Sequence, residues 1–433
     1  MQTVMVLALA IFILTYVLIS VRDFKVFKVD RYLAALIGAG LMILLGIVTP
    51  KEAWEAIDLG TLGLLLGMML LVVGLELCGF FTWVSIHLVS RSKNHFQFLV
   101  LLMVVTAVLS ALILNDTVVL IFTPIVIKVC QMIGANPVPF LVAEACAANI
   151  GSVATPVGNP QNAYIAVQSG ISFNQFFIGL APVAVLSLAA AIGIIWLAYR
   201  KQFSKNVPSG RNGVFHRSQS IDADAVLRDL PLRPIHRSIY FVVFVLGMVF
   251  TGFVLSNWLG VSLALVALLG GLTVLIVLPF LNQSASYVIM TKKVDWTLLL
   301  FFIGLFILLK GLDTSGVLQE MLDGFNSVND GGIATVSGLT VFTALLSNLI
   351  SNVPAVILLS PFVAELNSDR MWLTLASSST LAGNATILGA AANIIVVEGA
   401  RRQGILVSFW QFVKGGLLVT LVTLLISIIV LSL

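Results

Sequence analysis

Long runs of apolar residues, separated by short polar segments, follow one another along nearly the whole chain. A helix needs about 20 apolar residues to cross a bilayer. By that measure the pattern predicts ten full crossings, at residues 3–20, 32–49, 60–87, 138–167, 172–199, 238–256, 259–281, 295–316, 371–398 and 406–433. We therefore expect an all-α polytopic membrane protein.

Two further apolar segments, 97–133 and 333–363, are each long enough for two helices but are polar at their centres. The central polar residues are Asn115, Asp116 and Thr117 in the first segment and Ser351 and Asn352 in the second. We interpret each segment as a re-entrant helical hairpin that enters and leaves the membrane on the same side.

The two halves of the chain repeat each other. A shift of 237 positions places 57–79 on 294–316 and Asn115 on Asn352, and a shift of 231 places 154–162 on 385–393. Because each half has an odd number of crossings, the second copy must be inverted in the membrane. The chain therefore divides into a first inverted repeat of five transmembrane helices, a linker and a second inverted repeat of five, at residues 1–199, 200–237 and 238–433.

The crossing at 138–167 contains glycines, prolines and amides at its middle, in the sequence NIGSVATPVGNPQN. Pro156 and Pro160 disfavour a continuous helix, and Asn159 before Pro160 has the form of a helix N-cap followed by the first helical residue. The crossing at 371–398 offers a weaker break. Inverted repeats with interrupted helices in corresponding positions indicate a secondary transporter whose site lies near the membrane midplane.

We expect the two hairpin turns and the two breaks to converge on one pocket. The predicted substrate- or ion-binding residues are Asn115, Asp116, Thr117, Thr155, Asn159, Asn162, Ser351, Asn352, Asn384, Thr386 and Asn393. This set contains one carboxylate and no lysine or arginine. Such a lining favours a neutral or cationic substrate over a multivalent oxyanion.

A carboxylate at bilayer depth costs about 3 to more than 10 kcal/mol unless a protein-lined or wet cavity receives it. Asp116 is therefore our first candidate for a coupling residue, which would carry a proton in one state and release it in another. Glu76 and Asp313, which coincide under the repeat shift, are the next candidates. The alternative for Asp116 is a fixed structural carboxylate at the hairpin turn.

Other acidic residues in or beside the apolar runs have simpler interpretations. Asp58 and Asp295 lie where crossings begin, so we expect both to cap helices. Glu144 could reach the membrane interface by extending its side chain along the helix.

Charge and composition agree with this architecture. Hydrophobic residues make up 59% of the 433 positions and charged residues 10%, against roughly 25% charge in an ordinary soluble domain. Eighteen of the 23 lysines and arginines lie in loops on one side of the predicted topology, and the opposite loops hold only Lys51 and Arg370. The positive-inside rule then predicts a multi-pass plasma membrane protein with both termini outside and a cytoplasmic linker. The basic balance requires no nucleic-acid partner.

Motifs of enzymes and metal sites are missing from the sequence. It contains no HExxH, GxSxG or Walker A pattern, and its three cysteines, Cys78, Cys130 and Cys146, lie in apolar runs without CxxC or Cys/His spacing. We therefore expect no enzyme activity, no cofactor and no metal site. A channel stays open as an alternative to a carrier.

Four segments, NDTVVLIFTPIVI, NIGSVATPVGNPQN, SNLISNVPAVILLSP and LAGNATILGAAANIIVVEGAR, resemble the arsenite permease and NhaD-type antiporter branch of the ion transporter superfamily, which is distantly related to the divalent-anion/sodium symporters. The resemblance implies that hairpin tips and broken crossings form the substrate and ion sites, and it implies a homodimer. Together with the lining, it favours proton-coupled efflux of arsenite or antimonite. Na⁺/H⁺ antiport and sodium-coupled uptake of a dicarboxylate or sulfate-type anion stay open.

The orientation can be tested by cysteine labelling. An impermeant thiol reagent applied to intact cells should label a cysteine introduced near residue 327 and should not label one at position 211, because the first is predicted outside and the second inside. Labelling at position 211 instead of near residue 327 would reverse the assignment.

Overall fold

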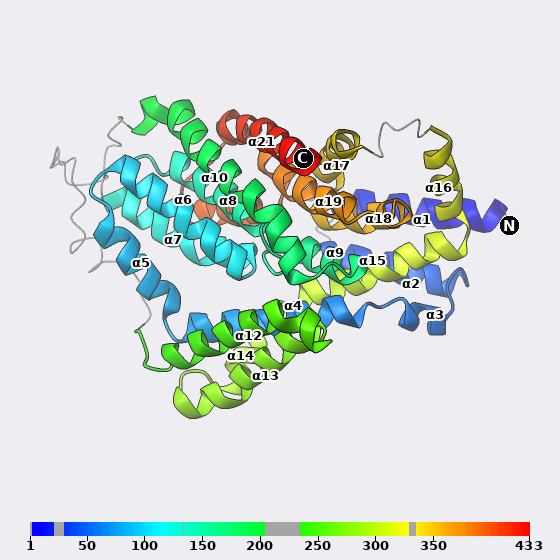
Figure 1. Cartoon of the computed structure of the whole chain (residues 1–433), viewed down its shortest axis with the longest axis horizontal. Helices are drawn as coiled ribbons and strands as arrows, with labels where there is room; N and C mark the ends of the chain where they lie inside the picture. Colours follow the sequence, from blue (N-terminus) through cyan, green and yellow to red (C-terminus); the bar gives the residue numbers. More distant parts are fainter. Residues whose placement is uncertain (1, 21–29, 133, 204–233, 329–334) are drawn as a thin grey trace.

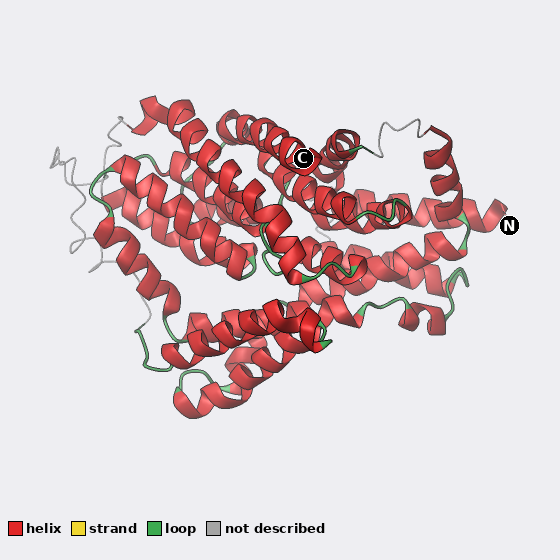
Figure 2. Ribbon diagram, viewed as in Figure 1, coloured by secondary structure: helices red, strands yellow, loops and turns green. Residues whose placement is uncertain are grey.

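The computed structural model describes residues 2–20, 30–132, 134–203, 234–328 and 335–433, and throughout these ranges the regular structure is helical (Figure 2). Most of the predicted linker lies outside the described residues. In the first repeat the helices are α1 (Gln2–Ser20), α2 (Arg31–Leu44), α3 (Pro50–Glu55), α4 (Leu59–Leu77), α5 (Phe80–Arg91), α6 (His95–Leu112), α7 (Asn115–Met132), α8 (Pro137–Ser152), α9 (Pro160–Ser169) and α10 (Phe173–Phe203).

The second repeat has the same order of helices. They are α12 (Ile239–Leu259), α13 (Leu263–Leu281), α14 (Tyr287–Lys293), α15 (Trp296–Thr314), α16 (Val317–Val328), α17 (Val336–Ile350), α18 (Asn352–Glu365), α19 (Asp369–Ala382), the 3₁₀ turn η1 (Gly383–Ala385), α20 (Ala391–Arg402) and α21 (Phe409–Ser432). Among the described residues, nine helices are long and apolar enough to span a membrane. The chain is thus an all-α polytopic membrane protein built from two repeats, each with a hairpin and a discontinuous helix.

The predicted crossing at 60–87 is wrong in one respect. Helix α4 ends at Leu77, and Gly79, with φ of 78°, lets the chain turn into the separate helix α5. Gly316, with φ of 83°, occupies the same place between α15 and α16. Glycine adopts this left-handed conformation without the steric cost that a side chain brings, so a single residue ends an otherwise continuous apolar run.

One group of helices, which we call the crossing bundle, consists of α1, α2, α4, α12, α13 and α15. Within it α4 packs along α13, and in the equivalent contact α15 packs along α2 (Figure 1). The backbones come very close: a Cβ atom added to Gly67 would lie 2.3 Å from the backbone carbon of Ala267, and one added to Gly304 would lie 2.7 Å from that of Ala35. Small residues at such contacts are typical of helix packing in membranes.

The remaining long helices form what we call the hairpin bundle, made of α6 to α10 and α17 to α21. Here α6 packs on α8, α17 packs on α19, and α10 lies against α21 (Figure 1). All four interruptions of the membrane helices belong to this bundle. The architecture therefore collects the polar breaks in one part of the molecule.

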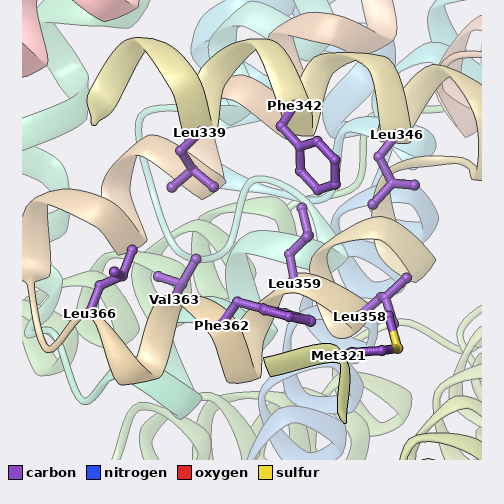
Figure 3. A pocket seen from close by; sticks show the side chains of 9 residues that line it. All are labelled: Met321, Leu339, Phe342, Leu346, Leu358, Leu359, Phe362, Val363 and Leu366. Carbon is purple, nitrogen blue, oxygen red and sulfur yellow. The ribbon is translucent and has the colours of Figure 1, made fainter. Parts of the chain in front are cut away.

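The short helices that join the two bundles differ between the repeats. Helix α5 packs against the hairpin α6–α7, with the rings of Phe81 and Phe122 6.3 Å apart, whereas α16 packs against α15 and α1. Between Met321 of α16 and the hairpin α17–α18 lies a cavity of about 370 Å³ (Figure 3). Its other lining residues are all apolar: Leu339, Phe342, Leu346, Leu358, Leu359, Phe362, Val363 and Leu366.

The close contact at Gly67 leads to a stability prediction. Gly67→Ala should destabilise the protein by roughly 1–3 kcal/mol, because overpacking forces the backbones apart. Gly247→Ala on α12 is the matched control, since a Cβ there has nothing within 4 Å and alanine favours the helix. Thermal unfolding of both purified variants in detergent is the measurement, and equal melting temperatures would contradict the packing account.

Candidate functional site

The first hairpin turn is fastened to the break between α8 and α9. Asn115 begins α7, and its backbone N–H donates to the carbonyl of Gly158 at 2.9 Å. Its side-chain amide donates to Oδ1 of Asn149 at 3.2 Å. The turn and the break are therefore held together by both backbone and side chain.

Asn159 caps the second half of this broken helix, as predicted. Its Oδ1 accepts a hydrogen bond from the backbone N–H of Asn162 at 2.9 Å, and Pro160 is the first helical residue. The Asn162 side chain turns back across the break and donates to the carbonyls of Ser152, at 2.9 Å, and Thr155, at 3.2 Å. One buried amide thus satisfies two carbonyls that the interrupted helix leaves free.

The second break uses the same arrangement. Asn393 donates to the carbonyls of Gly383, at 2.6 Å, and Thr386, at 2.8 Å. These carbonyls belong to the residues that the shift of 231 aligns with Ser152 and Thr155. The break there starts in the 3₁₀ turn η1, and Ala390, the residue before α20, supplies no side-chain cap.

Asn149 lies at the centre of the site and joins the two repeats. Its side-chain nitrogen donates to Oδ1 of Asn384 at 2.9 Å and to Oδ1 of Asn393 at 3.0 Å, and it is completely buried. It also accepts from Asn115. Asn149 is not among the site residues predicted from the sequence. The sequence feature that could have indicated it is an asparagine within an alanine-rich apolar helix, just before the break.

A reciprocal contact comes from the second repeat. Thr380, which the shift of 231 aligns with Asn149, accepts hydrogen bonds from Asn159 at 3.3 Å and from Gln161 at 3.1 Å. Thr380 and Gln161 were also missed by the sequence analysis. Each repeat therefore contributes a buried polar side chain to the break of the other.

The second hairpin turn is bound to the second break. Ser351, between α17 and α18, has φ of 76°, a conformation that is uncommon for a residue with a side chain and that marks functional turns more often than ordinary ones. Asn352, in the amide orientation that suits its neighbours, donates to the carbonyls of Ser379, at 3.0 Å, and Gly389, at 2.8 Å. Gly389 aligns with Gly158, so both hairpins meet the same point of a break.

The two predicted threonines of the breaks also reach the hairpins. The hydroxyl of Thr155 donates to the carbonyl of Ala111 at 2.6 Å, and that of Thr386 donates to Oδ1 of Asn348 at 3.4 Å. Both contacts join a break to the first helix of the neighbouring hairpin.

We call the buried polar side chains that join the breaks the amide cluster: Asn115, Asn149, Asn159, Gln161, Asn162, Thr380, Asn384 and Asn393. Asp116 and Thr117 follow Asn115 directly and are half-buried in the first turn of α7. The carboxylate lies at the N-terminal end of α7. This placement is compatible with both roles that we considered for Asp116.

The other two coupling candidates lie elsewhere. Glu76, near the end of α4, forms an ion pair with Lys293 at 2.7 Å, and Asp313, near the end of α15, forms one with Lys310 at 2.7 Å. All four side chains are partly exposed. Asp58 and Asp295 cap α4 and α15, as predicted.

Three buried atoms of the amide cluster have no hydrogen-bond partner in the described part of the chain: Oδ1 of Asn115, Oδ1 of Asn162 and Nδ2 of Asn384. Leaving such an atom unsatisfied costs roughly 1–3 kcal/mol, so a cluster of them is unusual for a purely structural site. The cluster offers two acceptors and one donor to a ligand. Amide oxygens of this kind can accept from hydroxyl groups or coordinate a hard cation.

Comparisons with known proteins agree with a transporter. The model of the citrate transporter family matches residues 9–383. An uncharacterized transporter of Mycobacterium tuberculosis is 34% identical over 97% of this chain and 96% of its own length. The silicon efflux transporter LSI3 of Oryza sativa subsp. japonica is 30% identical over 92% of each chain.

The fold also matches a solved structure. The crystal structure of the YdaH transporter of Alcanivorax borkumensis superposes with a TM-score of 0.59, at 18% identity, over 99% of this chain and 97% of the other. At this identity the likeness concerns the fold alone.

The central position of Asn149 can be tested by substitution. Asn149→Ala should lower the free energy of unfolding by several kcal/mol, since Asn384 and Asn393 each lose a donor and buried unsatisfied groups cost roughly 1–3 kcal/mol apiece. Asn174→Ala is the control: it removes one amide that bonds Val254 at 3.0 Å on the exposed surface, and should change stability by about 0.5 kcal/mol or less. Similar unfolding curves for the two variants would show that the cluster does not hold the repeats together.

Proposed function

Given that this chain belongs to the citrate transporter family, a family of secondary transporters in the ion transporter superfamily, we propose that it exports a small uncharged hydroxylated acid, arsenous or antimonous acid, in exchange for protons. The observation that carries the proposal is the chemistry of the amide cluster. Within the part of the chain that the structure describes, the cluster holds two amide oxygens and one amide nitrogen that are buried and have no hydrogen-bond partner.

An uncharged polyol suits these groups better than an anion does. Arsenous acid carries three hydroxyls near neutral pH, and each can donate to an amide oxygen or accept from an amide nitrogen. Among the side chains that bond one another in the cluster there is no lysine or arginine. A multivalent anion such as citrate would have to bring its own cation, because desolvating unpaired charge is costly.

The rice relative supports this choice of chemical class. Its name describes the efflux of silicon, and silicic acid, like arsenous acid, is uncharged and hydroxylated near neutral pH. The arsenite permease resemblance of the four signature segments points to the same class.

Export against a gradient needs a coupled ion, because a neutral solute gains nothing from the membrane potential. At about 2.3 kcal/mol per charge per 100 mV, one proton entering down roughly 150 mV can sustain a ratio of about 300-fold. Asp116, half-buried beside the cluster, is the carboxylate that we assign to this step. The basic loops orient the chain so that the linker is cytoplasmic.

Na⁺/H⁺ exchange is the second candidate, and one observation favours it. The Oδ1 atoms of Asn115 and Asn162, which have no partner among the described residues, are the hard, neutral ligands that alkali cations accept. Transporters with interrupted helices use such breaks to bind sodium. Fluxes of arsenite, sodium and citrate, measured side by side in proteoliposomes of purified protein, distinguish the candidates. Saturable arsenite flux that depends on the pH gradient supports our proposal and excludes a channel, whereas sodium flux alone would replace it with exchange.

The variant Asp116→Asn distinguishes a role of Asp116 in proton coupling from a role in binding arsenite. This near-isosteric amide should preserve folding and arsenite exchange at equal concentrations, because it keeps the shape of the side chain, yet it should abolish accumulation driven by a pH gradient. The control is Asp369→Asn, which alters an exposed carboxylate at the start of α19 and should leave accumulation unchanged. Wild-type accumulation and pH dependence in Asp116→Asn would contradict its coupling role.

A further inference from the structure

Glu144 of α8 is a buried carboxylate that the cluster does not use. The expectation that its side chain extends to the membrane interface is wrong, because the residue has 0% exposure. One oxygen, Oε1, accepts from the hydroxyl of Thr123 on α7 at 3.1 Å. The other oxygen, Oε2, has no partner among the described residues.

Within the described ranges, no positively charged side chain pairs with Glu144. The buried thiol of Cys130, on the same helix α7 as Thr123, is near enough to interact with Glu144 electrostatically. Most other titratable side chains on the helices around α8 are placed elsewhere. Asp116 and Lys128 are partly exposed, His95 contacts the carbonyl of Phe203, and Tyr199 donates to that of Gln411. The exposed ones are Arg200, Lys201, Asp369, Arg370, Glu398, Arg401, Arg402 and Lys414, and the thiol of Cys146, on α8 itself, is buried.

An ionised Glu144 would therefore be an isolated charge among apolar side chains with a single hydrogen-bond donor. Burying such a charge without a counter-ion is far more costly than burying the neutral acid. Glu144 accordingly holds a proton in this conformation. In either form of the carboxyl, Oε2 has no hydrogen-bond partner in the described part of the chain.

The fold itself does not need a carboxylate at this place. The shift of 231 aligns Glu144 with Leu375 of α19, which is also fully buried. An apolar side chain thus fills the equivalent position in the other repeat. The acid at position 144 calls for a chemical explanation rather than a packing one.

Glu144 is mechanically connected to the amide cluster. It lies five residues before Asn149 on α8, about 7.5 Å along the helix, and Thr123 lies on α7, the helix that Asn115 begins. Helices α7 and α8 are thus joined at one level by Asn115 and Asn149 and at another by Thr123 and Glu144. Helix α20 also packs closely against α7 at Thr123, since a Cβ added to Gly399 would lie 3.0 Å from Cγ2 of Thr123.

We propose that Glu144 is a second proton-carrying residue of the transport cycle, which rests on the proton coupling proposed above. It keeps its proton while α7 and α8 are closed around the Thr123 hydrogen bond. When these helices separate and water enters, the O–H bond breaks, the proton passes to water, and the carboxylate becomes hydrated. Closing the helices requires that a proton return.

Two measurements on the full-length purified protein test this proposal. Infrared spectroscopy should detect a protonated carboxyl group at neutral pH that titrates reversibly as the pH is raised and that is missing in Glu144→Gln but present in Asp369→Asn. In proteoliposomes with arsenite as the probe, Glu144→Gln should retain exchange, while pH-driven accumulation falls by roughly the 300-fold that one proton supplies.

Further variants separate a chemical role from a structural one. Glu144→Leu copies Leu375 of the other repeat and should fold, yet it should lose accumulation in the same way. Thr123→Val removes the donor to the carboxylate and should shift the infrared titration. Wild-type accumulation in Glu144→Gln, an ionised Glu144 at neutral pH, or a carboxyl that never titrates would each overturn the proposal. If the wild-type protein moves no arsenite, the proposed substrate is wrong, and the infrared titration still decides the role of Glu144.

Discussion

Every backbone amide at membrane depth must find its partner within the protein, because lipid offers none. The chain breaks two helices and turns two hairpins in this environment, and it satisfies the freed carbonyls with buried asparagines. Asn162 and Asn393 each bridge one break. Without these hydrogen bonds the free-energy cost of the buried, unsatisfied carbonyls would disfavour the breaks. The hairpin turns would then lose the breaks to which they are bound.

The reciprocal contacts of Asn149 and Thr380 make the site a joint property of the two repeats. Asn149 bonds side chains of the second break, and Thr380 bonds side chains of the first. Neither repeat satisfies its own break alone. In the crossing bundle, too, each repeat packs against the other, since α4 packs on α13 and α15 on α2.

Much of this architecture was predictable because its causes are local. Prolines and glycines indicate where the helices break, and Asn159 before Pro160 predicts where the next helix begins. The alignment of the two halves then relates segments that are far apart in the sequence. The end of α4 was missed because the chain turns at a single residue, Gly79, and the residues after it are again mostly apolar. Asn149, Thr380 and Gln161 were missed because their partners lie in the other half of the chain, or across a break, and nothing local reveals them. The environment of Glu144 depends likewise on tertiary packing.

Helices α5 and α16 pack differently relative to the hairpins of their repeats, although the two repeats align with each other in sequence. Leu359, which lines the apolar cavity, aligns with Phe122, which α5 covers. The two hairpins therefore differ in the room beside them: a cavity of about 370 Å³ lies next to the second, whereas a packed helix lies next to the first. A segment with fewer packed neighbours opens at a lower free-energy cost, so the second hairpin can change its position more readily than the first.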